Sequence, residues 1–290
     1  MRLAQVDRAL LRCLVIATAA LTMAPVPARA DDPTLPYQPY LEVPLLVVGA
    51  GSWIVTETVF KRDLAPATCR WCAPNAVDAS VRTALLWHRP ATADTLSNLG
   101  AYAAAPALAL SGLLVAAYRD GRSEQLPVDL LVVAESVAVA MDLDQAVKFT
   151  IGRERPFVHA LAPSQKLLTH APDDNNVSFY SGHSSWTFAL ATAAGTVALM
   201  HGYRLAPWIL GVGLAIAAST AYLRIAADQH YLTDVLTGAA MGSAFGVGLP
   251  YLLHHPASPA SSPPAALLRS VSVAVGPVPG GANASVGLRF

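Results

Sequence analysis

The chain has 290 residues, of which 54% are hydrophobic and only 13% are charged, and its formal net charge is zero. A soluble domain carries roughly a quarter charged residues, so this composition is typical of a protein whose solvent is the membrane. With no net charge and no long run of basic residues, the sequence gives no reason to expect a nucleic-acid partner.

The first 30 residues have the pattern of an export signal. Three arginines within the first twelve positions precede an apolar run from Cys13 to Met23, and Ala28-Arg29-Ala30 supplies small residues before a cleavage site. The mature chain would then begin at Asp31. The alternative is an uncleaved membrane anchor, although the run is short for a span of about 20 residues. Either version exports the segment that follows and indicates a bacterial envelope protein.

Two cysteines, Cys69 and Cys72, remain once Cys13 leaves with the signal. In an oxidising periplasm this C-x-x-C pair can close as a disulfide around Trp71. A redox centre is the alternative, but no thioredoxin-like pattern of strand and helix surrounds the pair. A zinc site needs four ligands, and only two thiols are present. We therefore expect a structural disulfide.

Four uncharged apolar runs are each close to the length that crosses about 30 Å of hydrocarbon. They cover residues 95–118, 184–203, 205–223 and 235–253. On the last run, three glycines recur every fourth residue, at Gly238, Gly242 and Gly246. Because missing side chains let a neighbouring helix approach closely, this spacing predicts tight packing of that helix.

Two further segments are less regular. Residues 128–148 carry Glu135, Asp142 and Asp144 inside an apolar pattern, so we expect this helix to turn its polar stripe into the bundle or the site. The run 43–56 is short and ends at Glu57, so it either spans obliquely or lies in the interface. The sequence thus predicts an all-α, membrane-embedded bundle of five to six apolar helices.

The end of the chain has a different character. Residues 256–264 form a Pro/Ser/Ala linker, and the alternation at 270–275 and 282–290, with a turn at 277–281, predicts a short tail or β-hairpin. The predicted organisation is a signal peptide (1–30), an apolar segment with the C-x-x-C loop (31–94), the helical bundle (95–253), and the linker with its tail (254–290).

Three separated motifs lie at the ends of apolar segments, where a water-exposed site in a membrane protein must sit. The first is Lys148 with Arg155-Pro156, the second is Ser181-Gly182-His183, and the third is Arg224 with His230 and Asp234. Singly, a basic residue at a helix end is often an interfacial anchor, and an i,i+4 His–Asp pair is often a surface hydrogen bond. Together, these residues form a set that suits phosphate chemistry.

The order and spacing of these residues resemble the type 2 phosphatidic acid phosphatase superfamily, which includes bacterial nonspecific acid phosphatases and vanadium haloperoxidases. Its signature reads K-x6-R-P, then P-S-G-H, then S-R-x5-H-x3-D. Tyr180 replaces the proline of the second motif and Leu223 the first serine of the third, whereas every charged or reacting group is present. The resemblance covers residues 95–253 and, with the apolar spans, indicates the membrane phosphatase branch.

Phosphoryl transfer needs positive charge on the non-bridging oxygens, a nucleophile in line with the leaving oxygen, and a proton for that oxygen. Lys148, Arg155 and Arg224 can supply the charge, with the Ser181 hydroxyl and the Gly182 amide as further donors. No set of carboxylates or histidines in the sequence has the spacing of metal ligands. We therefore expect neither a metal nor another cofactor.

The resemblance implies that His230 is the nucleophile that forms a phosphohistidine, that Asp234 holds its far ring nitrogen, and that His183 is the acid for the leaving group. The residues agree, because Asp234 follows His230 by one helical turn and Gly182 lets the backbone approach an oxyanion. The other histidines lack partners at such spacing, and we expect solvated loop residues at His159, His170, His254 and His255.

The leading hypothesis is a membrane phosphatase that hydrolyses a lipid phosphomonoester or diphosphate through a phosphohistidine, without metal, at the membrane surface. The family implies undecaprenyl diphosphate, phosphatidylglycerophosphate, phosphatidic acid or lipid A phosphate as candidates. Two alternatives stay open. A vanadium-dependent haloperoxidase is disfavoured by the apolar spans, and a non-catalytic phospholipid-binding or transport protein is disfavoured by the retained histidines and Asp234.

Arginine placement indicates the orientation. Arg119 and Arg122 lie in one connection and Arg204 in another, and the positive-inside rule places both connections in the cytoplasm. The site would then face the periplasm from the inner membrane. With an exported mature end, this orientation requires that residues 43–60 do not fully cross the membrane.

Overall fold

The computed structural model describes residues 34–255, 271–278 and 281–288. Its helices are α2 (Pro39–Thr58), α3 (Lys61–Leu64), α4 (Ala76–Leu85), α5 (Pro90–Leu99), the π-helix η1 (Gly100–Ala104), α6 (Ala105–Arg119), α7 (Leu126–Ile151), α8 (Pro156–His159), the 3-10 helices η2 (Pro163–Leu168) and η3 (Pro172–Asp174), α9 (Gly182–Met200), α10 (Ala206–Ala226) and α11 (Leu232–Leu253). The expected export signal and Pro-rich linker lie outside the described residues.

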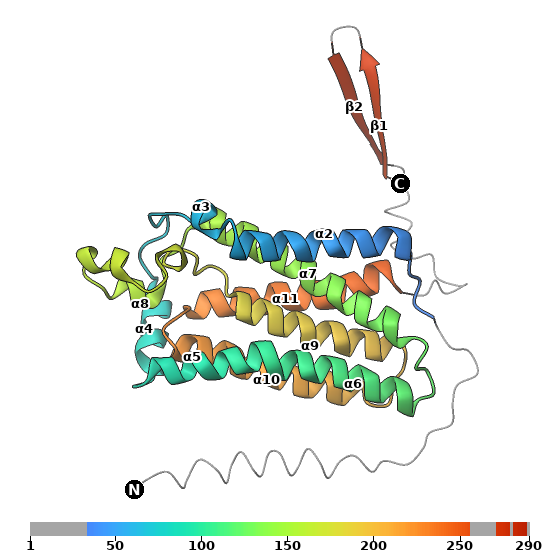
Figure 1. Ribbon diagram of the computed structural model, residues 1–290, viewed down its shortest axis with the longest axis horizontal. Coiled ribbons are helices and arrows are strands. Elements are labelled where there is room, and N and C mark those ends of the chain that lie inside the picture. Colours follow the sequence, from blue (N-terminus) through green and yellow to red (C-terminus); the bar gives the residue numbers. More distant parts are fainter. Residues whose placement is uncertain (1–33, 256–270, 279–280, 289–290) are drawn as a thin grey trace, which may run out of the picture. The chain divides into compact units, whose positions relative to one another are not determined.

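Six long helical segments run side by side, with neighbours in the chain pointing in opposite directions (Figure 1). They are α2, the continuous α5–η1–α6, α7, α9, α10 and α11. Among the described residues, four helices are long and apolar enough to cross a membrane: Pro39–Thr58, Pro90–Arg119, Ala206–Ala226 and Leu232–Leu253. The expected all-α, membrane-embedded bundle is confirmed.

Helix α9 is the centre of the bundle and packs against α6, α7, α10 and α11. Most of its residues are buried, and they include small polar ones such as Ser185, Thr187 and Thr192. These hydroxyls make α9 less apolar than the four candidate spans. The segment was expected to be a span; it is the inner helix of the bundle, and it is not among the described helices that length and hydropathy identify as candidate spans.

The glycines of α11 allow its contact with α9. A side chain at Gly238 or Gly242 would collide with the carbonyl of Ser181 or Ser185, and one at Gly246 with Thr192. The predicted close packing of this helix is confirmed. Its consequence for the site is that the start of α11 is held firmly against the start of α9.

Helix α2 differs from the other long helical segments because none of its residues is buried. It is longer than the apolar run 43–56 suggested, and it meets the length and hydropathy of a membrane span. Polar contacts join it to α7: Ser52 donates to Asp142 at 2.6 Å, and Gln145 donates to Glu57 at 2.8 Å. The acidic stripe of α7 therefore faces the bundle, as expected.

The connections that carry the three motifs gather at one end of the bundle, on the left of Figure 1, together with α3, α4 and α8. Near the C-terminus of the sequence, β1 (Val271–Val278) and β2 (Gly281–Leu288) pair as an antiparallel hairpin, with Val271 opposite Leu288. The predicted hairpin is confirmed in these described residues.

Candidate active site

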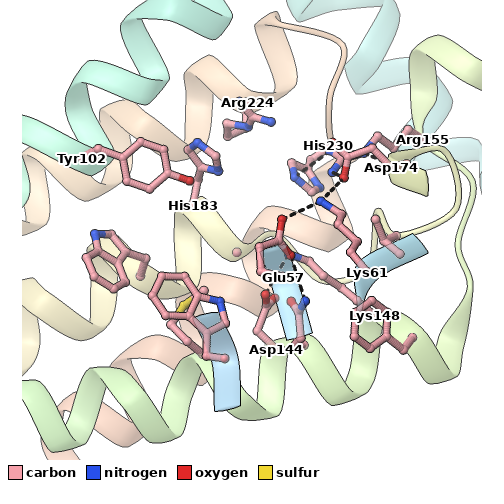
Figure 2. Close-up of a pocket in the computed structure, with 17 residues that line it drawn as sticks. Glu57, Lys61, Tyr102, Asp144, Lys148, Arg155, Asp174, His183, Arg224 and His230 are labelled. Atoms are coloured by element: carbon pink, nitrogen blue, oxygen red, sulfur yellow. Dashed lines mark hydrogen bonds and ion pairs between the residues drawn. The ribbon is translucent and has the colours of Figure 1, made fainter. Parts of the chain in front are cut away.

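A cavity of about 200 Å³ opens at the motif-bearing end of the bundle (Figure 2). Its motif-derived lining consists of Lys148, Arg155, Gly182, His183, Arg224 and His230. Five segments contribute: the end of α7, the start of α8, the start of α9, the end of α10 and the turn before α11. The structure thus brings together all three sequence motifs around one space.

Helix boundaries put these groups at the cavity. Helix α7 stops at Gly152, whose φ of 63° is left-handed and suits glycine, so Lys148 lies in its last turn. Arg155 is the residue before α8, where Pro156 starts a new helix. His230 lies in the short turn between α10 and α11. Ends of helices, rather than their middles, therefore supply the site.

Each of the three motif cations already holds one carboxylate. The pairs are Lys148–Asp144 at 2.8 Å, Arg155–Asp174 at 3.4 Å and Arg224–Asp94 at 2.5 Å. These partners keep the buried positive charges oriented while no anion is bound, because an unpaired buried charge is costly. Sequence analysis included Asp144 in the acidic stripe expected to face the bundle or the site, but it missed Asp174 and Asp94, since they stand outside the family motifs.

Donors remain for an anion. Arg224 is buried, and its Nε has no hydrogen-bond partner in the described part of the chain. Buried N–H groups are normally paired, so this free donor marks a place where a bound oxygen would be stabilised. Guanidinium and ammonium groups pair well with phosphate oxygens. The wall of the cavity therefore suits a phosphate group.

A fourth cation, Lys61, enters the cavity from α3, outside the three motifs. Its Nζ lies 2.5 Å from Glu57 and 2.7 Å from Asp174. Burial alone would raise the pKa of Asp174, but Arg155 and Lys61 outweigh burial and hold that pKa well below its usual range. Asp174 is therefore ionised and links Lys61 to Arg155 across the cavity.

The two partners of His230 fix its tautomer. Its Nδ1 lies 2.8 Å from the carbonyl oxygen of Ser178, which can only accept, so Nδ1 carries the proton and donates it. Its Nε2 lies 3.2 Å from Nη1 of Arg155, which can only donate. The lone pair of Nε2 therefore faces the cationic side of the cavity. A neutral imidazole with that lone pair is the form that can attack phosphorus.

Both cavity histidines are held neutral. Burial, followed by the charges of Arg155, Arg224 and Lys148, lowers the pKa of His230 well below its ordinary value. Burial and the same three cations lower the pKa of His183 as well, although Asp174 opposes them. A neutral His230 is ready to act as a nucleophile, whereas His183 needs a bound anion to offset the cations before it holds a proton at neutral pH.

His183 is positioned from α5. Its Nε2 lies 2.7 Å from Oδ1 of Asn98, and the Asn98 amide nitrogen donates to Asp94 at 3.3 Å. The contact with Asp94 orients the amide, so Nε2 of His183 donates to Oδ1 and its Nδ1 is the ring nitrogen left for a leaving group. Asn98 carries no motif signal, and sequence analysis could not have found it.

The structure gives Asp234 different partners from those expected. Its Oδ2 lies 3.7 Å from Nδ1 of His230, beyond hydrogen-bond distance, and accepts from Ser178 Oγ at 2.6 Å and Tyr231 N at 2.9 Å. Its Oδ1 accepts from Arg153 at 2.5 Å. Asp234 therefore acts on the histidine through space and through Ser178, whose carbonyl takes the direct bond.

Arg153 is the centre of a network behind the cavity. Its Nη2 donates to Asp78 at 2.6 Å, and its guanidinium carbon lies 3.8 Å from the ring centroid of Trp71 and 4.4 Å from that of Tyr231. Asp78 also accepts from Thr233 N at 2.9 Å, at the start of α11. Arg153 occupies a variable position of the first motif, so its spacing gave no signal.

Two predicted phosphate donors have structural roles. Ser181 does not line the cavity; it caps α9, where its Oγ accepts from Ser184 N at 3.4 Å. A Cβ at Gly182 would lie 2.7 Å from Lys148 Nζ and 2.9 Å from Asp144 Oδ2. The absence of a side chain at this position therefore makes room for the Lys148–Asp144 pair as well as exposing the backbone.

Cys69 and Cys72 are joined in a disulfide. The loop that it closes lies along the first motif: Arg70 N donates to Gly152 O at 2.9 Å, and Glu154 N donates to Trp71 O at 3.0 Å. Neither cysteine lines the cavity. The disulfide therefore supports the site through Trp71 and the backbone of 152–154.

The chain is similar to known phosphatases. Residues 129–256 match the model of the PAP2 superfamily. Lipid A 1-phosphatase of Porphyromonas gingivalis is 32% identical over 126 residues, which make up 43% of this chain and only 24% of that protein. The crystal structure of a transmembrane PAP2-type phosphatidylglycerolphosphate phosphatase from Bacillus subtilis is 19% identical, with a TM-score of 0.44, over 74% of this chain and 94% of that chain. The segment that matches the PAP2 superfamily contains every motif residue from Lys148 to Asp234, so the chain is similar to this superfamily over the part that carries the site.

Proposed function

We propose that the protein is a membrane-embedded phosphatase that hydrolyses a lipid phosphomonoester or diphosphate through a phosphohistidine at His230. The observation that carries the proposal is the placement of Nε2 of His230, whose lone pair faces a cavity walled by Lys148, Arg155 and Arg224. The match to lipid A 1-phosphatase, which covers about a quarter of that protein, supports the same class of substrate.

In the first step, the three cations bind the non-bridging oxygens and Nε2 of His230 attacks phosphorus. The bond from phosphorus to the lipid oxygen breaks, and the electron pair leaves with that oxygen, which takes a proton from His183. In the second step, His183 takes a proton from water, whose oxygen attacks phosphorus and displaces His230 as inorganic phosphate forms. Asp234, at 3.7 Å, stabilises the positive charge on the phosphorylated ring.

A second cavity supports a lipid substrate. It has a volume of about 280 Å³, lies between α2, α6, α7 and α9, and is lined almost entirely by apolar side chains. Trp53 and Trp186 line both this cavity and the cationic one, and their rings lie 5.4 Å apart. A hydrocarbon chain in the apolar cavity would therefore place its head group beside the cations.

We also propose that catalysis requires no metal, because Lys148, Arg155, Arg224 and Lys61 already deliver positive charge to the place where negative charge develops. The purified protein should release phosphate from a lipid phosphate in EDTA, and vanadate should inhibit it as a five-coordinate transition-state analogue. Loss of activity in EDTA with recovery in magnesium contradicts this part.

The decisive experiment is a panel of lipid phosphates given to purified protein in detergent, with released phosphate measured. Release from at least one lipid, abolished in His230→Ala, supports the proposal. Binding of lipids without release would point to a transport or binding protein. Bromide oxidation with peroxide and vanadate, without phosphate release, would point to a haloperoxidase.

For orientation, we propose that the cavity faces the periplasm. The Cys69–Cys72 disulfide lies at the cavity end of the bundle, and disulfides persist in that compartment. At the opposite end, the start of α2 lies near the end of α11, because Nδ1 of His254 is 2.9 Å from Pro36 O. If α2 crosses the membrane, its start and the cavity lie on opposite sides. An exported chain that begins at Asp31 would then place the cavity in the cytoplasm, so a periplasmic cavity would require a cytoplasmic start of α2.

Reporter fusions decide the orientation. Alkaline phosphatase fused after residue 165 should be active, and the same reporter after residue 121 should be inactive, since the two positions lie at opposite ends of the bundle. A fusion after Thr34 should be inactive, like the fusion after 121, if α2 crosses the membrane, and active if the start of the mature chain is exported and α2 does not cross. The reverse pattern would place the cavity in the cytoplasm.

A further inference from the structure

Two carboxylates and a histidine meet at the end of the bundle away from the cavity. Glu42 lies in the first turn of α2, Glu135 lies in α7, and His254 follows α11. One potential ligand atom of each lies within 4.8 Å of the others. The 22-residue α11 separates His254 from His230 by about 33 Å, so this cluster is distinct from the phosphate site.

His254 was expected to be a solvated loop residue, and that prediction is wrong: its side chain is 1% exposed. Its Nδ1 lies 2.9 Å from Pro36 O, a carbonyl that can only accept, so this nitrogen carries a proton. Its Nε2 lies 3.3 Å from Oε2 of Glu135. Two lone pairs cannot face each other stably in a buried place, so a positive charge belongs between them: either a proton or a metal ion.

Each carboxylate has one oxygen, Oε2, that no donor from outside the cluster reaches among the described residues. Oε2 of Glu42 is buried and has no hydrogen-bond partner among the described residues, although Oε1 accepts from Gln38 N at 3.0 Å. Glu135 uses Oε1 to accept from Tyr37 at 3.2 Å, which leaves Oε2 for the cluster. A buried acceptor without a donor is rare and costly, so Oε2 of Glu42 indicates a missing cation.

The charge count distinguishes the two candidates. Two carboxylates carry −2, and a protonated His254 would leave −1, whereas a divalent cation bound by neutral His254 leaves zero. The contacts of these three side chains in the part of the chain that the structure describes include no lysine or arginine. A proton alone therefore leaves one negative charge of this partly buried cluster without a cation among the described residues.

We propose that Glu42, Glu135 and His254 bind a divalent transition-metal cation, with Zn²⁺ as the best match. Zinc takes imidazole nitrogen and carboxylate oxygen at about 2.0–2.2 Å, and two such ligands on a tetrahedron lie about 3.3 Å apart. The separation of Nε2 and the Glu135 oxygen has that value. The contact of Nδ1 with a carbonyl is the usual outer partner of a ligating histidine. Water would complete the site.

The bound cation would hold α2 in place. This helix has no buried residue, yet it brings Trp53 and Glu57 to the phosphate cavity. A cation shared by α2, α7 and the end of α11 ties the start of α2 to the bundle, at the end opposite to those two residues. Its role is structural, because the cavity proposed for phosphoryl transfer lies at the opposite end of the bundle.

The test uses full-length protein in detergent, carrying no histidine tag, stripped with a chelator and then dialysed against buffered zinc at pH 8. Elemental analysis should find about one zinc per chain in the wild type and, as matched controls, in Glu124→Gln and His88→Gln, whose side chains are exposed. Glu135→Gln and His254→Gln should bind zinc at least about tenfold more weakly. Zinc should also raise the Tm of the wild type but not of these two variants.

The rival is a histidine proton held by two carboxylates. Burial alone would lower the pKa of His254, but the hydrogen bond with Glu135 and the charge of Glu42 raise it above its ordinary value. This rival gives wild-type protein with no tightly bound zinc and no zinc-dependent Tm, and either result overturns the proposal. Because a wild type without tightly bound zinc already overturns the proposal, a variant that fails to fold leaves the test able to contradict it. Equal zinc content in wild type and variants would show adventitious binding and would also overturn it.

Discussion

Arg155 and Arg153 stand two residues apart, and their side chains serve opposite faces of the site. Arg155 lines the cavity, where Nη1 approaches Nε2 of His230 at 3.2 Å and Nη2 lies 3.4 Å from Asp174 (Figure 2). Its contacts on the cavity side are long enough to be exchanged for a phosphate oxygen. Arg155 therefore belongs to the part of the molecule that changes partners during a reaction.

Arg153 is 1% exposed and faces away from the cavity. It binds Asp78 at 2.6 Å and Asp234 at 2.5 Å, and it lies against the rings of Trp71 and Tyr231. These contacts are short and buried, and they join Arg153 to the disulfide loop, to α4 and to α11. Arg153 therefore belongs to a fixed support whose partners do not change.

Because the two arginines have different kinds of partners, experiments can distinguish the reacting groups from the residues that support them. Losing a cavity cation such as Arg155 should cost turnover while the fold remains, because its partner Asp174 keeps a second cation, Lys61. Losing a group of the rear network should cost stability, because buried charges are left without partners. The predictions below are ordered by their expected effect on turnover.

The largest effect should follow His230→Ala. Without Nε2 there is no nucleophile, so turnover should fall by at least about ten-thousandfold on both lipid phosphates and p-nitrophenyl phosphate. Steady-state phosphate release measures the loss, and acid-labile ³²P on the wild-type protein, absent from the variant, identifies the intermediate. His159→Ala, at a half-exposed histidine of α8 outside the cavity lining, is the matched control and should stay near wild type. Near-normal turnover in His230→Ala would remove the phosphohistidine from the mechanism.

Next should come His183→Ala, with an effect that depends on the leaving group. For a lipid alkoxide, loss of the acid should lower turnover by roughly 10²- to 10⁴-fold, whereas p-nitrophenolate scarcely needs a proton. Asn98→Ala should show the same dependence with a smaller size, because Asn98 acts only through Nε2 of His183. Kinetics with leaving groups of graded basicity measure both. Equal losses on all leaving groups would mean that these residues bind phosphate rather than donate a proton.

The sequence predicted the cavity groups because their chemistry tolerates few residue types. Lys148, Arg155, His183, Arg224 and His230 follow from the motifs that resemble the family signature, and the structure puts all five around one cavity. The bundle was predictable for a similar reason, since apolar runs of span length have few other uses.

The rear network was not predictable, because its members come from unrelated positions and any well-packed polar set would serve. Asp78 and Trp71 lie outside residues 129–256, which match the family model. Arg153 and Arg155 are the same residue type, and only the direction of the side chain distinguishes them. That direction depends on Gly152 and on the β-bridge between the backbones of Trp71 and Arg153. Asp234 was placed beside His230 by helical spacing, yet its bonds to Arg153 and Ser178 depend on the tertiary fold.

The two arginines provide the direct test of the comparison. Arg155→Met should lower turnover by roughly 10²- to 10³-fold, as loss of one positioned donor does, with little change in stability. Arg153→Met leaves Asp78 and Asp234 buried without their cation and should cost about 3–5 kcal/mol of unfolding free energy. Thermal unfolding in detergent and turnover per folded molecule separate the two effects. If both variants lose turnover alike at unchanged Tm, the distinction between cavity and support is wrong.

The pH dependence should report His183. Since burial and the three cations lower its pKa, the free enzyme loses the acid as pH rises through a value below the ordinary one, and kcat/KM should then fall about tenfold per pH unit. A bound phosphate offsets the cations and raises that pKa, so the basic limb of kcat should lie at higher pH than that of kcat/KM. His183→Ala should lack both limbs. Any limb that remains in this variant comes from ionisation of the substrate and not from His183. A basic limb of kcat/KM above that of kcat would contradict this assignment.

The smallest effect on turnover should come from the disulfide. Cys69 and Cys72 do not line the cavity, and their loop reaches the site only through Trp71, which lies against Arg153. The double serine variant should keep its turnover within about twofold and lose at most about 3 kcal/mol of stability, because the closed loop is short. Trp71→Ala should destabilise more than the double serine variant, since it removes the ring that covers Arg153. Reduction of wild-type protein with dithiothreitol should reproduce the double serine variant. A thousandfold loss of turnover in well-folded double variant would show that the loop positions the reacting groups themselves, and the rear network would then have to be counted as part of the catalytic apparatus.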